Sequence, residues 1–520
     1  MDVVDVKVKQ GKIEREPAEV LVLGHYEDDR GLQGEAAAVD RALKGLLRDL
    51  LKSGEFEGKS CQTVVVHTQG RVPAKRVLLV GLGQKKEARL DTVRQALATV
   101  TKRVRQTGAK SFTVPLLGRT TTKASAVETA QAMVEGAVLG GYRFTEYRSD
   151  NHDEPRGLQR VTLVPSKDEP LASVKEGVRR GLASAEATMY VRDLCNHPSN
   201  VMTPSRIAAE ARKIGAERGV RVRVLERRDA ERLGMGAFIG VARGSHEPPK
   251  FIVLEYQGQA RGAGRGARGP GEGGNARPIV LVGKTITFDT GGISLKPAEN
   301  MEQMKADMTG GAEVLATVRA AARLRLPLHL VGILPATENM PGGRAIKPGD
   351  ILKTLSGKTV EVQNTDAEGR LILADGLAYA TRYKPAAIVD VATLTGACVV
   401  ALGQFAIGMF SNDERLKGRI QQAGARAGER VWEMPLWEEY FEQLRSDVAD
   451  MRNIGGRGGG MITAALFLSK FVGDCPWVHL DIASTDWSER ERAYIAKGPT
   501  GIGTRLLLQY LLHEAESRDE

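Results

Sequence analysis

Short apolar segments rich in Val, Ile and Leu alternate with segments of helical periodicity along most of the 520 residues. In the first part of the chain we expect strands at residues 18–24, 62–68, 76–83, 110–118 and 160–166. Between them, apolar residues recur at helical spacing. Such alternation is typical of an α/β domain with a largely parallel sheet.

A second series of the same kind follows. Its apolar residues are consecutive rather than alternating, which is typical of strands covered on both faces. The expected strands are residues 220–226, 250–256, 278–288, 328–336, 359–365, 386–396 and 477–485. The expected helices lie around residues 205–217, 299–325, 369–382 and 461–473.

The two series predict an α/β fold with two domains. The smaller N-terminal α/β domain would span residues 1–170, and a connecting helix would span residues 171–200. The larger domain, residues 201–520, would have a mostly parallel central sheet flanked by helices. A length of 520 residues suits such a division, because single cores stop growing beyond about 250–300 residues.

Composition favours a soluble protein in the cytoplasm, with no membrane partner. Hydrophobic residues make up 42% and charged residues 27% of the chain, and no apolar run approaches the roughly 18 residues of a membrane span. Residues 1–20 lack the apolar region of a secretory signal. The four cysteines show no CxxC pairing, which argues against a disulfide framework or a thiolate zinc site.

The net charge of +10 leaves an anionic partner such as nucleic acid open. The segment at residues 258–278 is rich in Gly and Arg and lies between two expected strands. It could contact nucleic acid, but we favour a flexible surface insertion, because long insertions between strands cost little conformational entropy.

Charged residues gather in otherwise apolar surroundings in two stretches, residues 282–311 and residues 364–371, NTDAEGRL. An ionised group at a buried strand end is costly unless it is paired or bound to metal. Four carboxylates come from three separated segments near expected strand ends or helix starts: Asp289, Asp307, Asp366 and Glu368. We expect them at the carboxyl edge of the sheet, where α/β folds bind ligands. Four acids sharing one pocket need cations between them, and oxygen ligands in this number suit two divalent ions that activate a water for hydrolysis.

Several motifs carry a resemblance to a known family. They are DTGGISLKP, NMEQMKADMTGG, NTDAEGRL, ATLTGA, ITAALFL, HLDIA and KGPTGIGTRLL. Together they resemble the leucyl aminopeptidases, also called cytosol aminopeptidases, which are two-metal metalloproteases. NTDAEGRL is a highly specific signature. The resemblance runs through the second half of the chain and the connector at residues 194–211, whereas the N-terminal part matches only in the order of its elements.

The resemblance implies a ligand set for two divalent ions, Mn²⁺ or Zn²⁺, with Mg²⁺ and Co²⁺ as alternatives. One ion would be held by Lys284, Asp289, Asp307 and Glu368. The other would be held by Asp289, Glu368 and Asp366, including the main-chain carbonyl of Asp366. A lysine ligates only as the neutral amine, and two adjacent dications would supply the necessary lowering of its pKa.

The resemblance also assigns the remaining chemistry. Lys296 would hydrogen-bond the scissile carbonyl and the developing oxyanion. Arg370 would hold bicarbonate, which takes a proton from the metal-bridging water. The pocket for the first side chain of a leucine-like substrate would be formed by Met304, Asn364, Ala367, Thr393 and Gly396. Core packing is an equal alternative for Met304.

The main hypothesis is thus a leucyl aminopeptidase, a metalloexopeptidase that acts on peptides with a free N-terminus and assembles as a homohexamer. Two alternatives stay open. Some bacterial members of the family also bind DNA, so an additional DNA-binding accessory or repressor role is compatible with the basic charge. A catalytically idle scaffold is disfavoured by the intact ligand set.

Overall fold

The computed structural model describes residues 4–149, 157–217, 219–258 and 277–517. The chain divides into one unit at residues 1–186 and 490–497, and another at residues 187–489 and 498–520. The division falls within the long helix α6 (Leu171–Asn196). Domain boundaries at residues 170 and 200 stay a prediction. The Gly/Arg-rich segment, apart from its first and last residues, lies outside the described residues.

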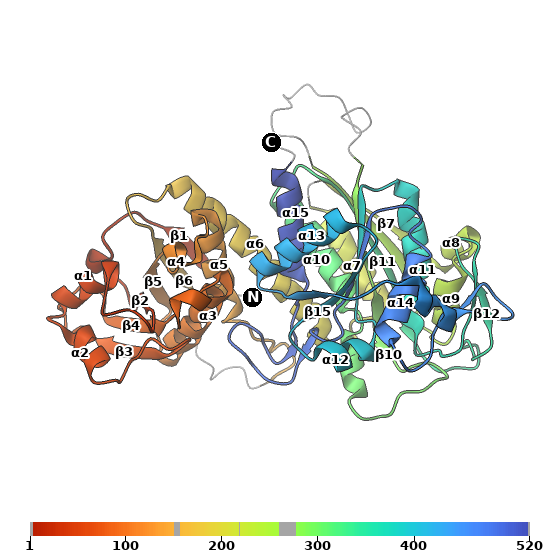
Figure 1. Cartoon of the computed structure of the whole chain (residues 1–520), viewed down its shortest axis with the longest axis horizontal. Helices are drawn as coiled ribbons and strands as arrows, with labels where there is room; N and C mark the ends of the chain where they lie inside the picture. Colours follow the sequence, from red (N-terminus) through yellow and green to blue (C-terminus); the bar gives the residue numbers. More distant parts are fainter. Residues whose placement is uncertain (1–3, 150–156, 218, 259–276, 518–520) are drawn as a thin grey trace, which may run out of the picture. The chain divides into compact units, whose positions relative to one another are not determined.

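The first unit is built on a sheet in the order β1-β6-β5-β2-β4-β3 (Figure 1). Its pairs are parallel except β3 with β4. The strands are β1 (Asp5–Val8), β2 (Leu21–His25), β3 (Thr63–His67), β4 (Arg76–Gly81), β5 (Ser111–Pro115) and β6 (Arg160–Val164). The helices are η1 (Ile13–Arg15), α1 (Gly34–Ala42), α2 (Leu46–Lys52), η2 (Lys85–Glu87), α3 (Leu90–Gln106), α4 (Arg119–Thr122) and α5 (Ala126–Leu139).

The second unit has a larger sheet in the order β16-β15-β18-β14-β9-β11-β8-β7, with β10 paired to β11. The inner strands β11, β9, β14 and β18 are parallel. Strand β8 pairs antiparallel with β11 and β7, and β15 pairs antiparallel with β18 but parallel with β16. The strands are β7 (Val220–Leu225), β8 (Lys250–Gln257), β9 (Ile279–Gly283), β10 (Thr285–Asp289), β11 (His329–Asn339), β14 (Ala387–Ala392), β15 (Ile407–Ser411), β16 (Val431–Glu433) and β18 (Trp477–Asp481). The predicted α/β class with a parallel-rich sheet is confirmed.

Helices cover both faces of this sheet (Figure 1). One face packs against α7 (Pro204–Gly215), α10 (Thr309–Arg323) and α13 (Glu414–Ala427), and α15 (Thr504–Glu516) packs on α10 and α13. The other face packs against α9 (Gly236–Ala242) and α11 (Glu368–Ala380), and α14 (Gly460–Ser469) packs on α11. Shorter elements complete the unit: α8 (Arg227–Leu233), η4 (Met301–Ala306), β12 (Ile351–Lys353), β13 (Thr359–Glu361), η5 (Thr381–Tyr383), α12 (Gly396–Leu402), η6 (Glu438–Leu444), β17 (Met451–Arg452), β19 (Trp487–Ser488) and β20 (Gly498–Pro499).

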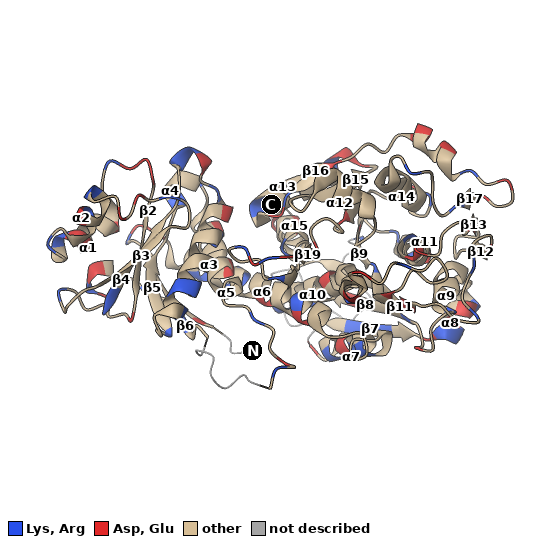
Figure 2. Ribbon diagram, turned by 90° about the horizontal axis from the view of Figure 1, so that it is seen from below, with Lys and Arg blue, Asp and Glu red and all other residues tan. Residues whose placement is uncertain are grey.

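Charged residues of both signs are dispersed over the two units (Figure 2). The net charge of +10 is therefore spread over many elements. Among the described residues, no helix is both long and apolar enough to cross a membrane.

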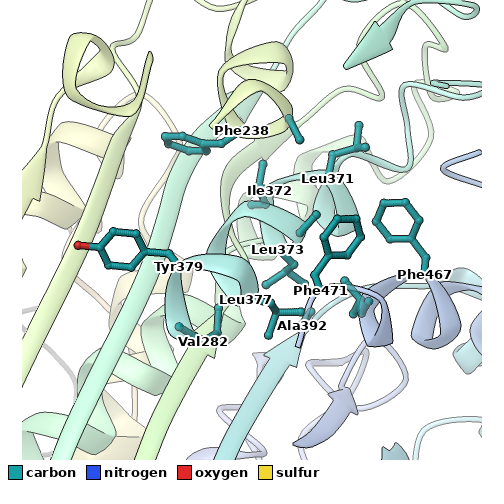
Figure 3. Close-up of a cluster of buried hydrophobic side chains, with 14 of the residues drawn as sticks. Phe238, Val282, Leu371, Ile372, Leu373, Leu377, Tyr379, Ala392, Phe467 and Phe471 are labelled. Atoms are coloured by element: carbon teal, nitrogen blue, oxygen red, sulfur yellow. The ribbon is translucent and has the colours of Figure 1, made fainter. Parts of the chain in front are cut away.

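Helix α11 is the element that brings NTDAEGRL into the interior. All its residues are buried, including Glu368 and Arg370 in its first turn. Figure 3 shows its leucines and isoleucine between Phe238 of α9 and Phe467 and Phe471 at α14. A helix that is apolar all round is stable only when neighbours enclose it. The charged first turn is thus anchored by the apolar turns that follow.

Two expectations about strands were wrong. The segment at residues 278–288 is not one strand: β9 ends at Gly283, β10 begins at Thr285, and Lys284 between them belongs to neither. Residues 359–365 do not join the central sheet: β13 pairs with β12 and β17 in a small separate sheet. The apolar pattern of a short segment predicts a strand, but it does not reveal where the strand is interrupted or which strand it pairs with.

Candidate metal centre

Three chain segments meet at one end of the parallel strands in the second unit. Asp289 is the last residue of β10, Asp307 directly follows η4, and Glu368 begins α11. Carboxylate oxygens of Asp289, Asp366 and Glu368 all lie within 4.8 Å of one another. The structure therefore brings together acids that lie in separate segments of the sequence.

Lys284 lies in the gap between β9 and β10. Its main-chain N–H donates to the carbonyl of Val391 (3.0 Å), and its carbonyl accepts from the N–H of Gly311 (2.7 Å). Its Nζ lies 2.7 Å from Oδ1 of Asp307 and 2.9 Å from Oε1 of Glu368. The interruption between the two strands thus directs the buried side chain of Lys284 toward the acidic cluster.

Gly369 is required by this arrangement. A Cβ at this position would lie 2.6–2.8 Å from Cε, Cδ and Nζ of Lys284. The lysine cannot easily give way, because Nζ also donates to the carbonyl of Thr393 (2.8 Å) in addition to its two ion pairs. The glycine of the NTDAEGRL motif therefore provides space for the lysine.

Lys296 approaches the same acids from a loop. Its Nζ lies 2.9 Å from Oδ2 of Asp289 and also pairs with Asp366. The loop closes through the N–H of Lys296, which donates to the carbonyl of Thr290 (2.9 Å). Gly291 and Gly292 have φ of 86° and 67°, a left-handed conformation that glycine adopts without strain.

Supporting side chains hold the acids in place. Nδ2 of Asn339 donates to Oδ1 of Asp289 (2.7 Å), and the N–H of Gly291 donates to the same oxygen (2.9 Å). The hydroxyl of Thr393 donates to Oδ1 of Asp307 (2.7 Å). Asn339 was missed at the sequence level, although its place at the end of β11, beside β10, could have indicated it.

Arg370 is a buried residue in the first turn of α11, two positions after Glu368. Its Nη1 donates to the main-chain carbonyl of Asn453 (2.8 Å). Asn453 in turn accepts from the N–H of Gln363 (2.8 Å) and donates to the carbonyl of Asn364 (2.7 Å). This asparagine, also missed at the sequence level, links the segment before NTDAEGRL to β17.

Burial and like charge both act on the acids. Burial raises the pKa of Asp307 well above its usual value, and Glu368 and Asp289 raise it further while Lys284 opposes them. Burial likewise raises the pKa of Glu368. For Lys284, burial lowers the pKa, but the neighbouring carboxylates outweigh it and raise the pKa overall. Burial lowers the pKa of Arg370 to about 10.

The donor set fits divalent cations. Oδ2 of Asp307 and Oε2 of Glu368 are buried and have no hydrogen-bond partner among the described residues. Buried carboxylate oxygens are normally satisfied, and hard oxygen donors of this kind suit Mg²⁺, Mn²⁺ and Zn²⁺. The cluster can therefore hold cations in addition to the two lysines.

Three of the five predicted pocket residues, Asn364, Ala367 and Thr393, adjoin this cluster. Asn364 accepts from the N–H of Asp366 (2.8 Å), and Ala367 directly precedes Glu368. Thr393 contacts both Lys284 and Asp307, whereas Gly396 is exposed at the start of α12. Met304 is half-buried in η4, three residues before Asp307. Their role in binding the first side chain of a substrate stays a prediction.

Comparisons with known proteins agree on one family. The catalytic-domain profile of the cytosol aminopeptidase family matches residues 189–508, and the profile of its N-terminal domain matches residues 20–151. The chain is 46% identical over 498 residues to a probable cytosol aminopeptidase of Geobacter sp. (strain M21), covering 94% of this chain and 96% of the relative.

Two solved structures are similar over nearly the whole chain. A tomato leucine aminopeptidase mutant has a TM-score of 0.84 at 31% identity, covering 98% of this chain and 96% of the other. The bottromycin maturation enzyme BotP in complex with Mn has a TM-score of 0.82 at 36% identity, covering 96% and 99%.

Proposed function

The chain belongs to the cytosol aminopeptidase family of metallo-aminopeptidases, and we propose that it removes leucine or similar residues from the N-terminus of peptides. The observation that carries this proposal is the cluster of four acids and two lysines at one end of the parallel strands. Oxygen and amine donors converge there from three chain segments.

We propose that residues of this cluster are the ligands of two ions. We assign one ion to Lys284, Asp289, Asp307 and Glu368, and the other to Asp289, Asp366 and Glu368, with the main-chain carbonyl of Asp366. The close approach of the carboxylate oxygens and the two unpartnered oxygens support the assignment. When bound, the ions supply Lewis acidity, which polarises a carbonyl and lowers the pKa of a water. We propose Mn²⁺ or Zn²⁺, with Mg²⁺ and Co²⁺ as alternatives.

We assign to Lys296 the role of hydrogen-bond donor to the scissile carbonyl and the developing oxyanion. It reaches the acids from the loop and its side chain is 23% exposed, so its ammonium group can turn toward a ligand. A donor placed where negative charge develops stabilises the transition state. Arg370 is assigned to bicarbonate, which supplies a proton acceptor when bound. Among the described residues, its guanidinium donates to a single acceptor, the carbonyl of Asn453.

Substrate selection would follow from the same residues. A free N-terminal amine can bind beside Lys284, which orients the first peptide bond toward Lys296. We propose that the first side chain lies among Met304, Asn364, Ala367, Thr393 and Gly396. Leucine preference would then rest on the apolar part of this surface.

Release of the chromophore from a leucyl arylamide is the direct test. The expected result is hydrolysis with added Mn²⁺ or Zn²⁺, loss with a chelator, and recovery when the metal is restored. N-acetyl-leucyl arylamide is the matched control, and it should not be cleaved. Activity that survives the chelator, or no activity with any of the four metals, would refute the function.

Assembly and DNA binding are separate proposals. We propose a homohexamer in the cytoplasm, which light scattering would test by its mass relative to the 56.2 kDa chain. The basic net charge leaves an additional DNA-binding role as the second candidate. A gel-shift assay over a salt series tests it, and no retardation at low salt would exclude it.

A further inference from the structure

A cavity separate from the metal centre lies in the second unit, where α8, α9 and the turn after β12 meet (Figure 1). Its volume is about 630 Å³. This volume falls in the range of roughly 300–1,000 Å³ that is typical of sites for small organic molecules. The described residues that line it include no acid or lysine of the metal centre. The proposed function therefore leaves this cavity without a role.

Three cationic side chains line the cavity. They are Arg227, the first residue of α8, Arg243, directly after α9, and Lys353, the last residue of β12. In the described part of the chain, none of the three forms an ion pair. Cations close by but outside the cavity are paired, Arg232 with Asp229 and Lys250 with Glu226. The cavity thus gathers cations that lack an acidic partner.

The charge of the lining favours a dianion. One acid, Glu231, lies among the lining residues beside the three cations, so positive charges exceed negative ones by two. Glu231 follows Arg227 by one turn of α8, but Arg227 instead donates from Nη2 to the carbonyl of Ala242 (3.5 Å). A guanidinium matches phosphate oxygens in geometry, and a phosphate monoester carries close to two negative charges at neutral pH.

Part of the cavity wall is apolar. Leu233 and Leu355 are half-buried, whereas Met235 and Ile239 are buried. Inorganic phosphate alone would leave this apolar surface in contact with water. A phosphate ester with an apolar or aromatic body would cover it, and burial of apolar area favours binding. The lining therefore matches an organic phosphate better than a free phosphate ion.

The walls of the cavity are joined by a carboxylate of α11. Oδ2 of Asp375 accepts from the N–H of Phe238 in α9 (2.8 Å), and Oδ1 accepts from the N–H of Leu355 after β12 (2.7 Å). Asp375 is 0% exposed, so water does not compete readily for these bonds. The two segments also approach closely, because a Cβ at Gly236 would lie 2.2 Å from the carbonyl oxygen of Lys353. Walls fixed in advance lose little conformational entropy when a ligand binds.

We propose that this cavity binds an organic phosphate monoester. Arg227, Arg243 and Lys353 would hold the phosphate, and the apolar body would lie against Met235 and Ile239. The site goes beyond the proposed function, since it needs neither the metal ions nor a peptide substrate.

Calorimetric titration of the full chain with AMP tests the proposal. AMP joins a phosphate monoester to an aromatic body, whereas adenosine lacks the phosphate and inorganic phosphate lacks the body. Arg227→Gln removes the half-buried member of the three cations, and Glu231→Gln removes the acid. Arg228→Gln is the matched control, because it removes the same charge from an exposed neighbouring position of α8 that does not line the cavity.

We expect AMP to bind more tightly than adenosine or inorganic phosphate. Arg227→Gln should weaken AMP binding about five- to tenfold, the loss of one charge-assisted hydrogen bond at a partly exposed site. Glu231→Gln should strengthen it about two- to threefold, because a like charge is removed. Arg228→Gln should behave as the unmodified protein. Equal affinity for adenosine and AMP, or equal AMP affinity in Arg227→Gln and the unmodified protein, would overturn the proposal.

Two controls keep the result specific to this cavity. If Arg227→Gln does not fold, Glu231→Gln decides by the opposite sign, and unchanged or weaker AMP binding there would contradict the site. Titration is repeated on protein treated with a chelator, where AMP affinity should persist; its loss would place the phosphate on the metal ions and overturn the proposal. A protein that binds AMP in this way but cleaves no arylamide would refute the proposed function and leave this inference standing.

Discussion

Replacing Asn339 by alanine tests how the supporting residues hold the acids. Nδ2 of Asn339 donates to Oδ1 of Asp289 (2.7 Å) and to the carbonyl of Thr365 (3.1 Å). Asn339 is 2% exposed, so solvent does not replace these bonds readily. In the alanine variant, Oδ1 of Asp289 keeps only the N–H of Gly291 as a donor.

The size of the effect follows from the charge on Asp289. A hydrogen bond to a charged group contributes about 1.5–3 kcal/mol. Because 1.4 kcal/mol corresponds to a factor of ten, we expect metal affinity to fall about 10–100-fold. The carbonyl of Thr365 also loses a donor, so the free energy of unfolding should fall by about 1–3 kcal/mol.

Metal affinity is measured by competition with a chromogenic chelator, and unfolding by denaturant titration. Asn412→Ala is the control, because the side chain of Asn412 also makes two hydrogen bonds, with the N–H of Trp477 (2.7 Å) and the carbonyl of Cys475 (3.0 Å), but neither involves an acid of the cluster. It should destabilise the fold without changing metal affinity. Equal metal affinity in Asn339→Ala and the unmodified protein would show that Asp289 does not depend on this support.

Three further changes have defined outcomes. Lys296→Ala should lower turnover about 10²–10³-fold, as for loss of an oxyanion donor, with metal content by elemental analysis near that of the unmodified protein; parallel loss of metal would contradict the assigned role. Gly369→Ala places a methyl group against Lys284 and should cost about 1–3 kcal/mol of unfolding free energy and weaken metal binding; unchanged affinity would mean that Lys284 moves aside freely. Burial raises the pKa of Glu313 in the folded protein well above its usual value. As pH rises, the carboxyl ionises first in the unfolded chain, and the free energy of unfolding falls. Glu313→Gln should therefore match the unmodified protein in acid and exceed it in unfolding free energy at alkaline pH, and a gap that narrows with rising pH would contradict this.

The sequence predicted the layered fold because its inner strands are rich in consecutive apolar residues. Strands β9, β11, β14 and β18 lie where consecutive Val, Ile and Leu residues predicted them. It missed the short strand β16 at the edge of the sheet and its neighbour β15, whose few residues carry no distinctive period. It also missed the break at Lys284, because an apolar run continues on both sides of this residue.

The acids of the site were predictable because buried charge in an apolar segment is rare. Their supports were missed, because Asn339 and Asn453 are uncharged and single asparagines are common in loops and strand ends. Only the place of Asn339 at the end of β11 could have indicated its role. The hydrogen bonds that join Asp390 to Trp477 and His479 were equally hidden, since these residues lie on two strands that only the parallel pairing brings together. Partners across a sheet depend on register, which local sequence does not encode.

The apolar core and the charged cluster depend on each other through α11. Its leucines and isoleucine pack with α9 and α14, so the helix cannot shift without opening that core (Figure 3). Glu368 and Arg370 occupy its first turn, and the missing Cβ of Gly369 leaves room for Lys284. A buried carboxylate beside other carboxylates would normally move apart from them, but the packed helix holds Glu368 in place. The repulsion is thereby retained in the fold, and it is relieved by the lysines or by bound cations. The apolar helix is thus the physical reason why these carboxylates stay close enough together to hold cations.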